Sequence, residues 1–337
     1  MNKPGNFFVS RMVIRYRGVN MRCFATIWGL LIFYLSAMSQ QSQYKIVYNV
    51  FEDTAKDNYE IYSMNLDGSG KKNITNTPGV EWVYYAYKDR VFFISDRDTC
   101  HRCYFLYEMD ADGKNVRKLS NLQLEDSWMS SRNNGSEMIV LGRIGKQVRN
   151  QLFLINLSDG SFTQVTTDTI STKRDPLFLP NGDEIVFAYR PDKSLRRSVP
   201  AELWKMNLDG SNKIQLTFFP KTDTTTQWFE YHAGPPRWNN KYKFISYMSK
   251  QKGQTQIYAL NIDGKKQWQL TEGDLSSGWH SWSADGEWLI MDKSNHDGRQ
   301  FDIYLMNYKS KKTKRLTNDW RAEQAPVFAE IKNPRIQ

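Results

Sequence analysis

The stretch "LWKMNLDGSNKIQLT", residues 203 to 217, has the pattern of a β-hairpin. Two sets of side chains alternate up to Leu208, an Asp209-Gly210 turn sequence follows, and a second short run ends at Thr217. Asp-Gly between two alternating runs is the strongest short-range hairpin signal in a sequence. We therefore interpret the stretch as two antiparallel strands joined by a tight turn.

The same pattern occurs six times along the chain. The copies are "IYSMNLDGSGKKNIT" (61–75), "LYEMDADGKNVRKLS" (106–120), "LFLINLSDGSFTQVT" (152–166), "LWKMNLDGSNKIQLT" (203–217), "IYALNIDGKKQWQLT" (257–271) and "IYLMNYKSKKTKRLT" (303–317). Each begins with Ile or Leu and ends fourteen positions later with Thr or Ser, while successive copies start 45, 46, 51, 54 and 46 residues apart. A constant inner length inside a variable outer spacing indicates a structural repeat.

Each hairpin is preceded by an apolar strand. These strands are "YKIVYNV" (44–50), "RVFFIS" (90–95), "EMIVLG" (137–142), "EIVFAY" (184–189), "KFISYM" (243–248) and "WLIMDK" (288–293). A turn and one more short strand, such as "PLFLP" (176–180) or "HSWSA" (280–284), come before them. Four short strands per repeat of this length are typical of a propeller blade, and a blade buries its faces only by stacking on its neighbours.

The two ends of the repeat region complement each other. The first copy lacks an innermost strand, and the strand "QAPVFAE" (324–330) is left over after the sixth hairpin. If this strand completes the first blade, it closes the ring and removes an exposed sheet edge. We therefore predict an all-β fold, a six-bladed β-propeller of four-stranded blades closed by its C-terminal strand.

The repeat resembles that of TolB-like six-bladed propellers. The resemblance rests on the "YxMNxDGSxxxxLT" pattern and on "WSADGEWLIM" (282–291), and it covers residues 44 to 330. Ala284 replaces the proline of the family's W-S-P-D-G turn, and the sixth hairpin has Tyr308-Lys309-Ser310 in place of Asp-Gly. Authentic TolB carries an N-terminal α/β domain before its propeller, and we expect no such domain from the residues that precede the repeats in this sequence. The resemblance thus implies the fold and does not imply a Tol–Pal role.

The N-terminal region has the layout of a secretory signal peptide. Arg22 precedes an apolar run from Cys23 to Ala37, and the small-x-small step Ala37-Met38-Ser39 follows it. We expect residues 1–39 to be a signal peptide or N-terminal extension and residues 40–337 to be the propeller. An uncleaved anchor is the alternative, and it would be the chain's only contact with a membrane. The expected location is periplasmic or secreted.

Removing that segment weakens the case for nucleic acid as a partner. Residues 1–39 contain five of the 46 Lys and Arg residues and no Asp or Glu, so 41 basic and 36 acidic residues remain, a formal charge of +5 rather than +10.

Cys100 and Cys103 are the two cysteines outside residues 1–39. We expect them to form a local disulfide, as an oxidising compartment allows, and a zinc site is the alternative. The Asp-Gly pairs are interpreted as turns rather than calcium loops. No metal or cofactor is expected.

The candidate binding residues lie in loops that share one face of a propeller, namely those that lead into the inner strands and those that join the second and third strands. Trp82, Trp128 and Trp279 are expected at the mouth of the central channel, and Asp175, His232 and His280 come from equivalent loops. Arg190, Arg196 and Arg197 belong to the most basic second-to-third loop, "RPDKSLRRSVP" (190–200). The long segment 218–236 lies on the same face and is expected to form a lid or specificity loop.

Aromatic rings beside a cationic collar suit an acidic peptide or an anionic glycan. We therefore expect a non-catalytic module of the cell envelope that binds a protein or peptide segment. The alternative is a carbohydrate-active enzyme similar to the metal-dependent oligogalacturonate lyases, which share this repeat type and use a histidine-rich metal site. Of the four histidines, this chain could supply at most His232 and His280 to such a site, and nothing in the spacing brings in a third.

Overall fold

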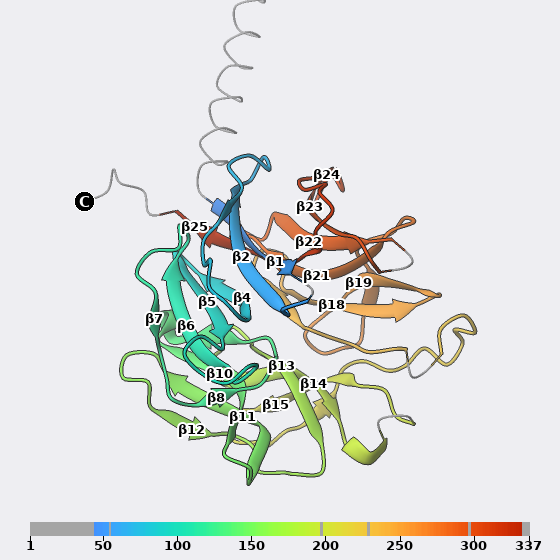
Figure 1. Ribbon diagram of the computed structural model, residues 1–337. Coiled ribbons are helices and arrows are strands. Elements are labelled where there is room, and N and C mark those ends of the chain that lie inside the picture. The colour runs from blue at the N-terminus through green and yellow to red at the C-terminus, as the bar shows by residue number, and fades with distance from the viewer. Residues whose placement is uncertain (1–43, 54, 196–197, 228–229, 296–297, 332–337) are drawn as a thin grey trace, which may run out of the picture. The chain divides into compact units, whose positions relative to one another are not determined.

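The repeats fold into six antiparallel sheets arranged as the blades of a β-propeller, which confirms the predicted all-β architecture (Figure 1). The computed structural model describes residues 44–331, except 54, 196–197, 228–229 and 296–297. Two short 3-10 segments, η1 (Asn133–Gly135) and η2 (Lys193–Leu195), interrupt the loops of this described part. Within it, no helix is long and apolar enough to span a membrane.

The strands of each blade follow one another from the central axis outward. The inner strands are β25 (Glu323–Glu330), β4 (Glu81–Tyr87), β8 (Gln123–Leu124) with β9 (Ser130–Arg132), β13 (Thr172–Phe178), β17 (Arg237–Asn239) and β21 (Ser276–Trp282). The second strands are β1 (Tyr44–Asp53), β5 (Arg90–Ser95), β10 (Glu137–Ile144), β14 (Glu184–Arg190), β18 (Phe244–Gln251) and β22 (Trp288–Ser294). The third strands are β2 (Asn58–Asn65), β6 (Phe105–Asp110), β11 (Val148–Asn156), β15 (Glu202–Asn207), β19 (Gln254–Leu260) and β23 (Phe301–Asn307). The outer strands are β3 (Lys72–Asn73), β7 (Arg117–Lys118), β12 (Phe162–Gln164), β16 (Ile214–Gln215), β20 (Gln267–Gln269) and β24 (Thr313–Arg315).

The C-terminal strand closes the ring as predicted. β25 pairs antiparallel with β1, with Val47 opposite Val327 and Tyr44 opposite Glu330. In Figure 1 the red β25 lies beside the blue β1. The first blade therefore takes its inner strand from the end of the chain and its other three strands from the beginning.

The stretch 203–217 forms the two outer strands of the fourth blade. Trp204 of β15 lies opposite Gln215 of β16. In the turn, the Asp209 carboxylate accepts hydrogen bonds from the main-chain N–H and the hydroxyl of Ser211, at 2.9 and 2.6 Å. Gly210 has a φ of +86°, which favours glycine. These contacts explain Asp-Gly at this position as turn chemistry.

In five of the six copies, a threonine explains the constant separation of fourteen positions between the first and the last residue. The hydroxyl oxygen of Thr217 accepts a hydrogen bond from the main-chain N–H of Leu203 at 2.8 Å, and the hydroxyl donates to the Glu202 carboxylate at 2.7 Å. The pairing fixes the distance between the start of the third strand and the end of the hairpin. The same N–H to hydroxyl bond joins Ile61 to Thr75, Leu152 to Thr166, Ile257 to Thr271 and Ile303 to Thr317.

We expect the substitution Thr217→Val to lower the free energy of unfolding by about 2 kcal/mol, because it leaves the buried N–H of Leu203 without an acceptor and removes one donor to Glu202. Urea unfolding of both proteins measures the difference. Thr163→Val on the exposed strand β12 is the matched control and should change the free energy by less than about 0.5 kcal/mol. Equal effects of the two substitutions would contradict this role.

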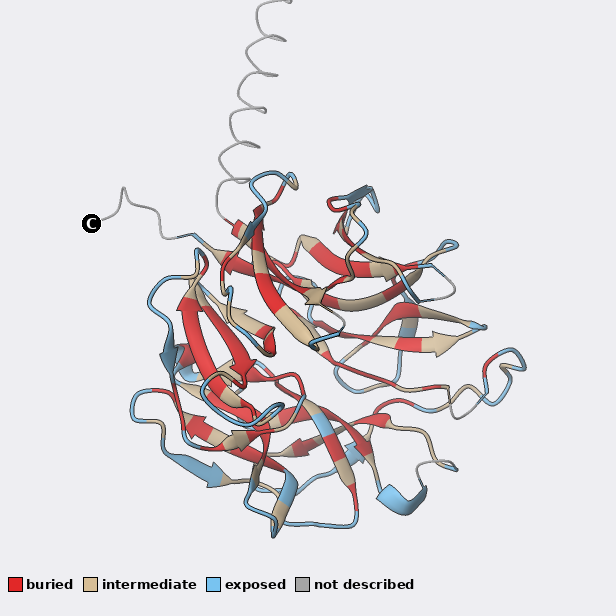
Figure 2. Cartoon of the chain, in the orientation of Figure 1, coloured by how far each residue is buried: buried red, intermediate tan, exposed pale blue. Residues whose placement is uncertain are grey.

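The hydrophobic core is divided among the interfaces between neighbouring blades. One cluster fills the space between the third and fourth blades, one the fourth and fifth, one the fifth and sixth, and one the sixth and first. A larger cluster joins the first three blades. Figure 2 shows the resulting pattern, with buried residues concentrated along the inner parts of the blades and exposed residues at outer strands such as β12.

The long segment 218–236 is anchored to the fourth blade through Glu202. The carboxylate of this buried residue accepts hydrogen bonds from the main-chain N–H of Phe219 at 2.6 Å and from the hydroxyl of Tyr231 at 3.0 Å. Burial raises the pKa of Glu202, and these donors act in the opposite direction. Glu202 thus binds both Thr217 at the end of the hairpin and the segment that carries His232.

Candidate functional site

A pocket of about 570 Å³ lies at the centre of the face predicted to carry the binding loops. We call it the loop-side pocket, and its aromatic lining residues are Tyr59, Trp82, Tyr84, Tyr104, Trp128 and Trp279. Its charged lining residues are Arg102, Asp126, Arg174 and Asp175, and His232 and Gln324 add polar groups. Residues from both predicted kinds of loop contribute, for example Trp82 at the start of β4 and Arg102 between β5 and β6.

Five of the predicted site residues line this pocket, and Arg190 and His280 do not. Those in the lining are Trp82, Trp128, Asp175, His232 and Trp279. The side chain of Arg190 is turned into its own loop, where Nε donates to the main-chain oxygen of Val199 at 2.7 Å. The predicted residues Arg196 and Arg197 lie outside the described residues.

His280 is fully buried beside the fifth blade instead of lying at the mouth. Its Nε2 is 2.8 Å from the hydroxyl oxygen of Ser246, which also accepts a hydrogen bond from the indole of Trp282. Burial, together with the nearby positive charge of Arg237, lowers the pKa of His280 to about 3, so the ring is neutral at physiological pH. A register shift between Ser277 and His280 in β21 changes which side chains point toward the neighbouring blade.

The aromatic residues of the pocket form a connected wall. Trp82 contacts Tyr59 and Trp279 edge to face, with ring centroids 4.9 and 5.7 Å apart. Tyr84 contacts Trp128 in the same way at 5.0 Å. Edge-to-face pairs hold the rings at steep angles, so ring faces as well as edges are available to a ligand.

Two aspartates of neighbouring blades line the pocket, Asp126 in the loop between β8 and β9 and Asp175 on the inner strand β13. The Asp175 carboxylate accepts hydrogen bonds from the Ser127 hydroxyl at 3.1 Å and from the main-chain N–H of Trp128 at 3.0 Å. Asp175 has a φ of +57° at a register shift in β13, which carries its side chain to the third blade. The carboxylate of Asp126 accepts the hydroxyl hydrogen of Tyr84.

The floor of the pocket is a tryptophan that covers an arginine. Trp128 is 3% exposed, and the guanidinium carbon of Arg237 lies 3.7 Å from its ring centroid. Arg237 donates to the main-chain oxygens of His280 and Pro236, at 3.0 and 2.9 Å. Burial lowers the pKa of Arg237 to about 9, and Asp175 opposes that shift, so the group is a cation at neutral pH.

A second pocket of about 560 Å³ occupies the opposite end of the channel, among the turns between first and second strands. We call it the turn-side pocket. Arg237 and Trp238 line it, and Tyr84 lines both pockets. Trp128 lines the loop-side pocket and Arg237 the turn-side pocket, so this stacked pair separates the two.

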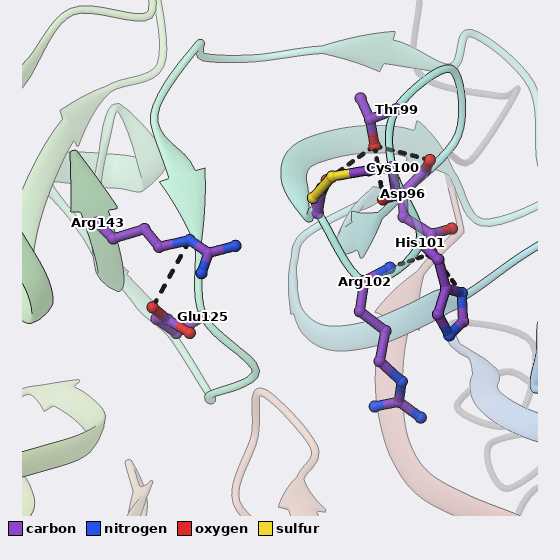
Figure 3. Close-up of a disulfide and its surroundings, with 8 residues drawn as sticks. Asp96, Thr99, Cys100, His101, Arg102, Glu125 and Arg143 are labelled. Carbon is purple, nitrogen blue, oxygen red and sulfur yellow. Dashed lines mark hydrogen bonds and ion pairs between the residues drawn. A yellow bond between two sulfur atoms is a disulfide. The ribbon is translucent and has the colours of Figure 1, made fainter. Parts of the chain in front are cut away.

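Cys100 and Cys103 are joined by a disulfide with a Cα–Cα distance of 5.2 Å. The bond closes the loop that carries His101 and Arg102, whose side chains extend clear of the sulfur atoms (Figure 3). The main-chain N–H of Arg102 donates to the Asp96 carboxylate at 2.7 Å, and its guanidinium binds the carboxylate of Asp57 through two hydrogen bonds of 2.8 Å. The loop therefore fixes Arg102 at the edge of the loop-side pocket.

The described residues contain no group of three His, Cys, Asp or Glu side chains placed to hold a metal ion. His232 lines the loop-side pocket and His280 does not, so the two histidines named for the lyase alternative do not share it. Burial lowers the pKa of His232, which is therefore mostly neutral at physiological pH.

Several lining residues were missed by reasoning from the sequence. Asp126 and Arg174 lie within two positions of the predicted site residues Trp128 and Asp175. Their position in the sequence alone could have identified them as pocket residues. Arg102 lies between the two cysteines, in a loop that joins a second and a third strand, and this position could also have identified it. Tyr59 and Tyr104 lie on the third-strand side of the blades, where nothing in the repeat distinguishes a pocket residue from a core residue.

No family model and no curated protein matches this sequence. Solved structures match in fold. TolB from Acinetobacter baumannii aligns over 86% of this chain and 67% of its own, with 14% identity and a TM-score of 0.65. Putative TolB from Agrobacterium tumefaciens aligns over 84% of this chain and 91% of its own, with 14% identity and a TM-score of 0.59. An oligogalacturonate lyase from Vibrio parahaemolyticus aligns over 76% of this chain and 70% of its own, with 14% identity and a TM-score of 0.50.

Identities this low concern the fold and not the ligand. The TolB structures align with the six-bladed ring of this chain, in which β25 closes the first blade. The chain therefore has a TolB-like six-bladed β-propeller fold.

Proposed function

We propose that this protein is an exported, non-catalytic binding module that holds a segment of a protein partner in its loop-side pocket. The observation that carries the proposal is the pocket itself, with six aromatic residues around a space of about 570 Å³ and a few charged groups among them. Pockets of this size and lining bind ligands by burying apolar surface and fix their orientation through a small number of polar contacts.

An exposed tryptophan on the same face supports a protein as the partner. Trp320 is 79% exposed and follows Thr317 in the connection to the inner strand β25. In two other blades the equivalent connections lead into the inner strands β4 and β21, which supply Trp82 and Trp279 to the pocket. Exposed tryptophans are enriched at protein interfaces, where they become buried. Trp320 would then contact the partner outside the pocket.

Two features support export to the periplasm or the medium. The segment 1–39 has the sequence layout of a secretory signal, although it lies outside the described residues. The Cys100–Cys103 disulfide fits an oxidising compartment. Fractionation of cells that produce the full chain, followed by N-terminal sequencing of the product, tests this part of the proposal.

The binding function is tested by affinity capture from the cell envelope of the source organism. We expect the variant Trp82→Leu/Trp279→Leu to recover its main partner at least about tenfold less than the wild type, because two aromatic contacts of about 1 kcal/mol or more each are lost. The leucines keep apolar volume beside the core. Unfolding midpoints of both proteins establish that the variant is folded.

The matched control is Ile262→Ala on an exposed hairpin turn, which should recover the partner as the wild type does. Equal recovery by the pocket variant would overturn the proposed function. Turnover of oligogalacturonate by the wild type with added Mn²⁺, and its loss in His232→Ala, would instead establish the enzyme alternative.

A further inference from the structure

The charges in the loop-side pocket are not balanced by one another. Arg102 is neutralised by Asp57, which binds its guanidinium through two hydrogen bonds. Within the described part of the chain, neither Asp126 nor Asp175 has a cationic side chain within ion-pair distance, and the groups that donate hydrogen bonds to these carboxylates are a tyrosine hydroxyl, a serine hydroxyl and a main-chain N–H. Both carboxylates thus face the pocket without an ion-pair partner, and the buried cation that acts electrostatically on Asp175, Arg237, lies against the ring of Trp128.

Arg174 is the one other cation in the pocket lining, and its geometry leaves both carboxylates available. Its Nη2 donates to the main-chain oxygen of Asp126 at 2.6 Å, not to a carboxylate. The side chains of Arg174 and Asp126 are both exposed, so water screens their charges more than it screens the charge of the half-buried Asp175. The lining therefore has a negative balance once the Arg102–Asp57 pair is set aside.

The aromatic wall favours the same sign of ligand charge. The face of an aromatic ring carries negative potential and attracts ammonium and guanidinium groups, by up to about 2 kcal/mol where water is excluded. Trp82 and Trp279 stand at right angles to each other, with an interplanar angle of 87°. The two rings thus face different directions in a pocket that Asp126 and Asp175 also line.

We propose that the loop-side pocket selects a basic side chain, a lysine or an arginine, in the partner segment that it binds. This inference rests on the proposed function. The apolar stem of such a side chain packs against the tryptophans while its charged end reaches Asp126 and Asp175. An acidic side chain or a uronic acid would bring a third carboxylate into the pocket, which electrostatic repulsion disfavours.

The proposal reverses the ligand charge expected from the sequence. That expectation came from the arginines of the loop 190–200. Arg190 does not line the loop-side pocket, and Arg196 and Arg197 lie outside the described residues. The charge of the pocket is set by the loops that lead into the third and fourth inner strands.

The test is selection from a phage-displayed library of random linear peptides on the full-length mature protein. Selection runs in parallel on the wild type and on Asp126→Asn/Asp175→Asn, which keeps an acceptor at each position, and asparagine tolerates the positive φ of residue 175. The matched control Asp209→Asn/Asp263→Asn makes the same change of charge at exposed hairpin turns. We expect Lys and Arg to be enriched by the wild type and the control, and not by the pocket variant.

A synthetic peptide from the enriched pool then measures how much its basic residue contributes to binding. Replacing its basic residue with glutamine should weaken binding to the wild type at least about tenfold and binding to the pocket variant much less. Pocket-dependent enrichment of acidic or uncharged peptides would overturn this inference and leave the proposed function standing. Failure of every peptide to depend on Trp82 and Trp279 would overturn both.

Discussion

Replacing Trp128 with alanine is expected to lower the free energy of unfolding by about 3–5 kcal/mol. Trp128 is 3% exposed and lies between the ring of Tyr84 and the guanidinium of Arg237. The substitution leaves a cavity at the centre of the ring and exposes the cation of Arg237, which has no carboxylate within ion-pair distance among the described residues and only the weaker electrostatic interaction with Asp175. Urea unfolding, followed by tryptophan fluorescence and circular dichroism, measures the change.

Two further variants separate cavity formation from loss of the ring over Arg237. Trp128→Phe keeps an aromatic face and loses part of the volume, so it should lower the free energy of unfolding by about half as much as Trp128→Ala. Trp320→Ala removes a tryptophan that is 79% exposed and should change it by less than about 0.5 kcal/mol. A change below about 1 kcal/mol for Trp128→Ala would show that this residue does not stabilise the floor of the pocket.

The fold was predictable because its repeat depends on short-range chemistry. Asp209 and Gly210 form the turn within their own hairpin, and Thr217 binds a residue fourteen positions earlier in the same blade. Strand boundaries followed from the same local pattern, as β5 shows by matching the predicted 90–95. Closure by the last strand was predictable by counting strands, because one blade lacked the strand that the other end supplied.

The site was less predictable because it depends on contacts between blades. Trp128 was expected at the mouth, and it lies at the floor because Arg237, more than a hundred residues later, packs against it. His280 and Asp175 each stand at a register shift of an inner strand, where a period of two no longer tells which way a side chain points. The identities of the residues in these loops were visible, but their directions were not.

Asp292 joins the two blades at the closure of the ring, and its ionisation should make stability depend on pH. It is 1% exposed on β22, and its carboxylate accepts hydrogen bonds from the main-chain N–H of Trp279 at 3.1 Å and of Ala325 in β25 at 2.9 Å. Burial raises the pKa of Asp292 from 3.8 to about 7. The residue thus holds both a wall of the loop-side pocket and the closing strand.

The direction of the pH effect follows from proton binding in the two states. Below about pH 4 the carboxyl of Asp292 is protonated in both the folded and the unfolded chain. Between about pH 4 and 7 the unfolded chain releases this proton while the folded chain keeps it, so the free energy of unfolding falls as pH rises, by about 4 kcal/mol in all. Above about pH 7 this contribution no longer changes.

The variant Asp292→Asn isolates this contribution, because its side chain does not titrate. It loses one of the two hydrogen bonds and should be less stable than the wild type at about pH 5 by about 1–3 kcal/mol. That difference should shrink by about 2–3 kcal/mol, or reverse sign, at about pH 8, where the wild type has a buried carboxylate. Urea unfolding of both proteins at the two pH values measures it.

Two other buried groups also make stability depend on pH. Burial raises the pKa of Glu323 to about 7, which lowers stability as pH rises, and it lowers the pKa of His280, which has the opposite effect. Both groups contribute equally to the two proteins and cancel in the difference. A difference that stays constant from about pH 5 to 8 would mean that Asp292 ionises in the folded protein as easily as in the unfolded chain.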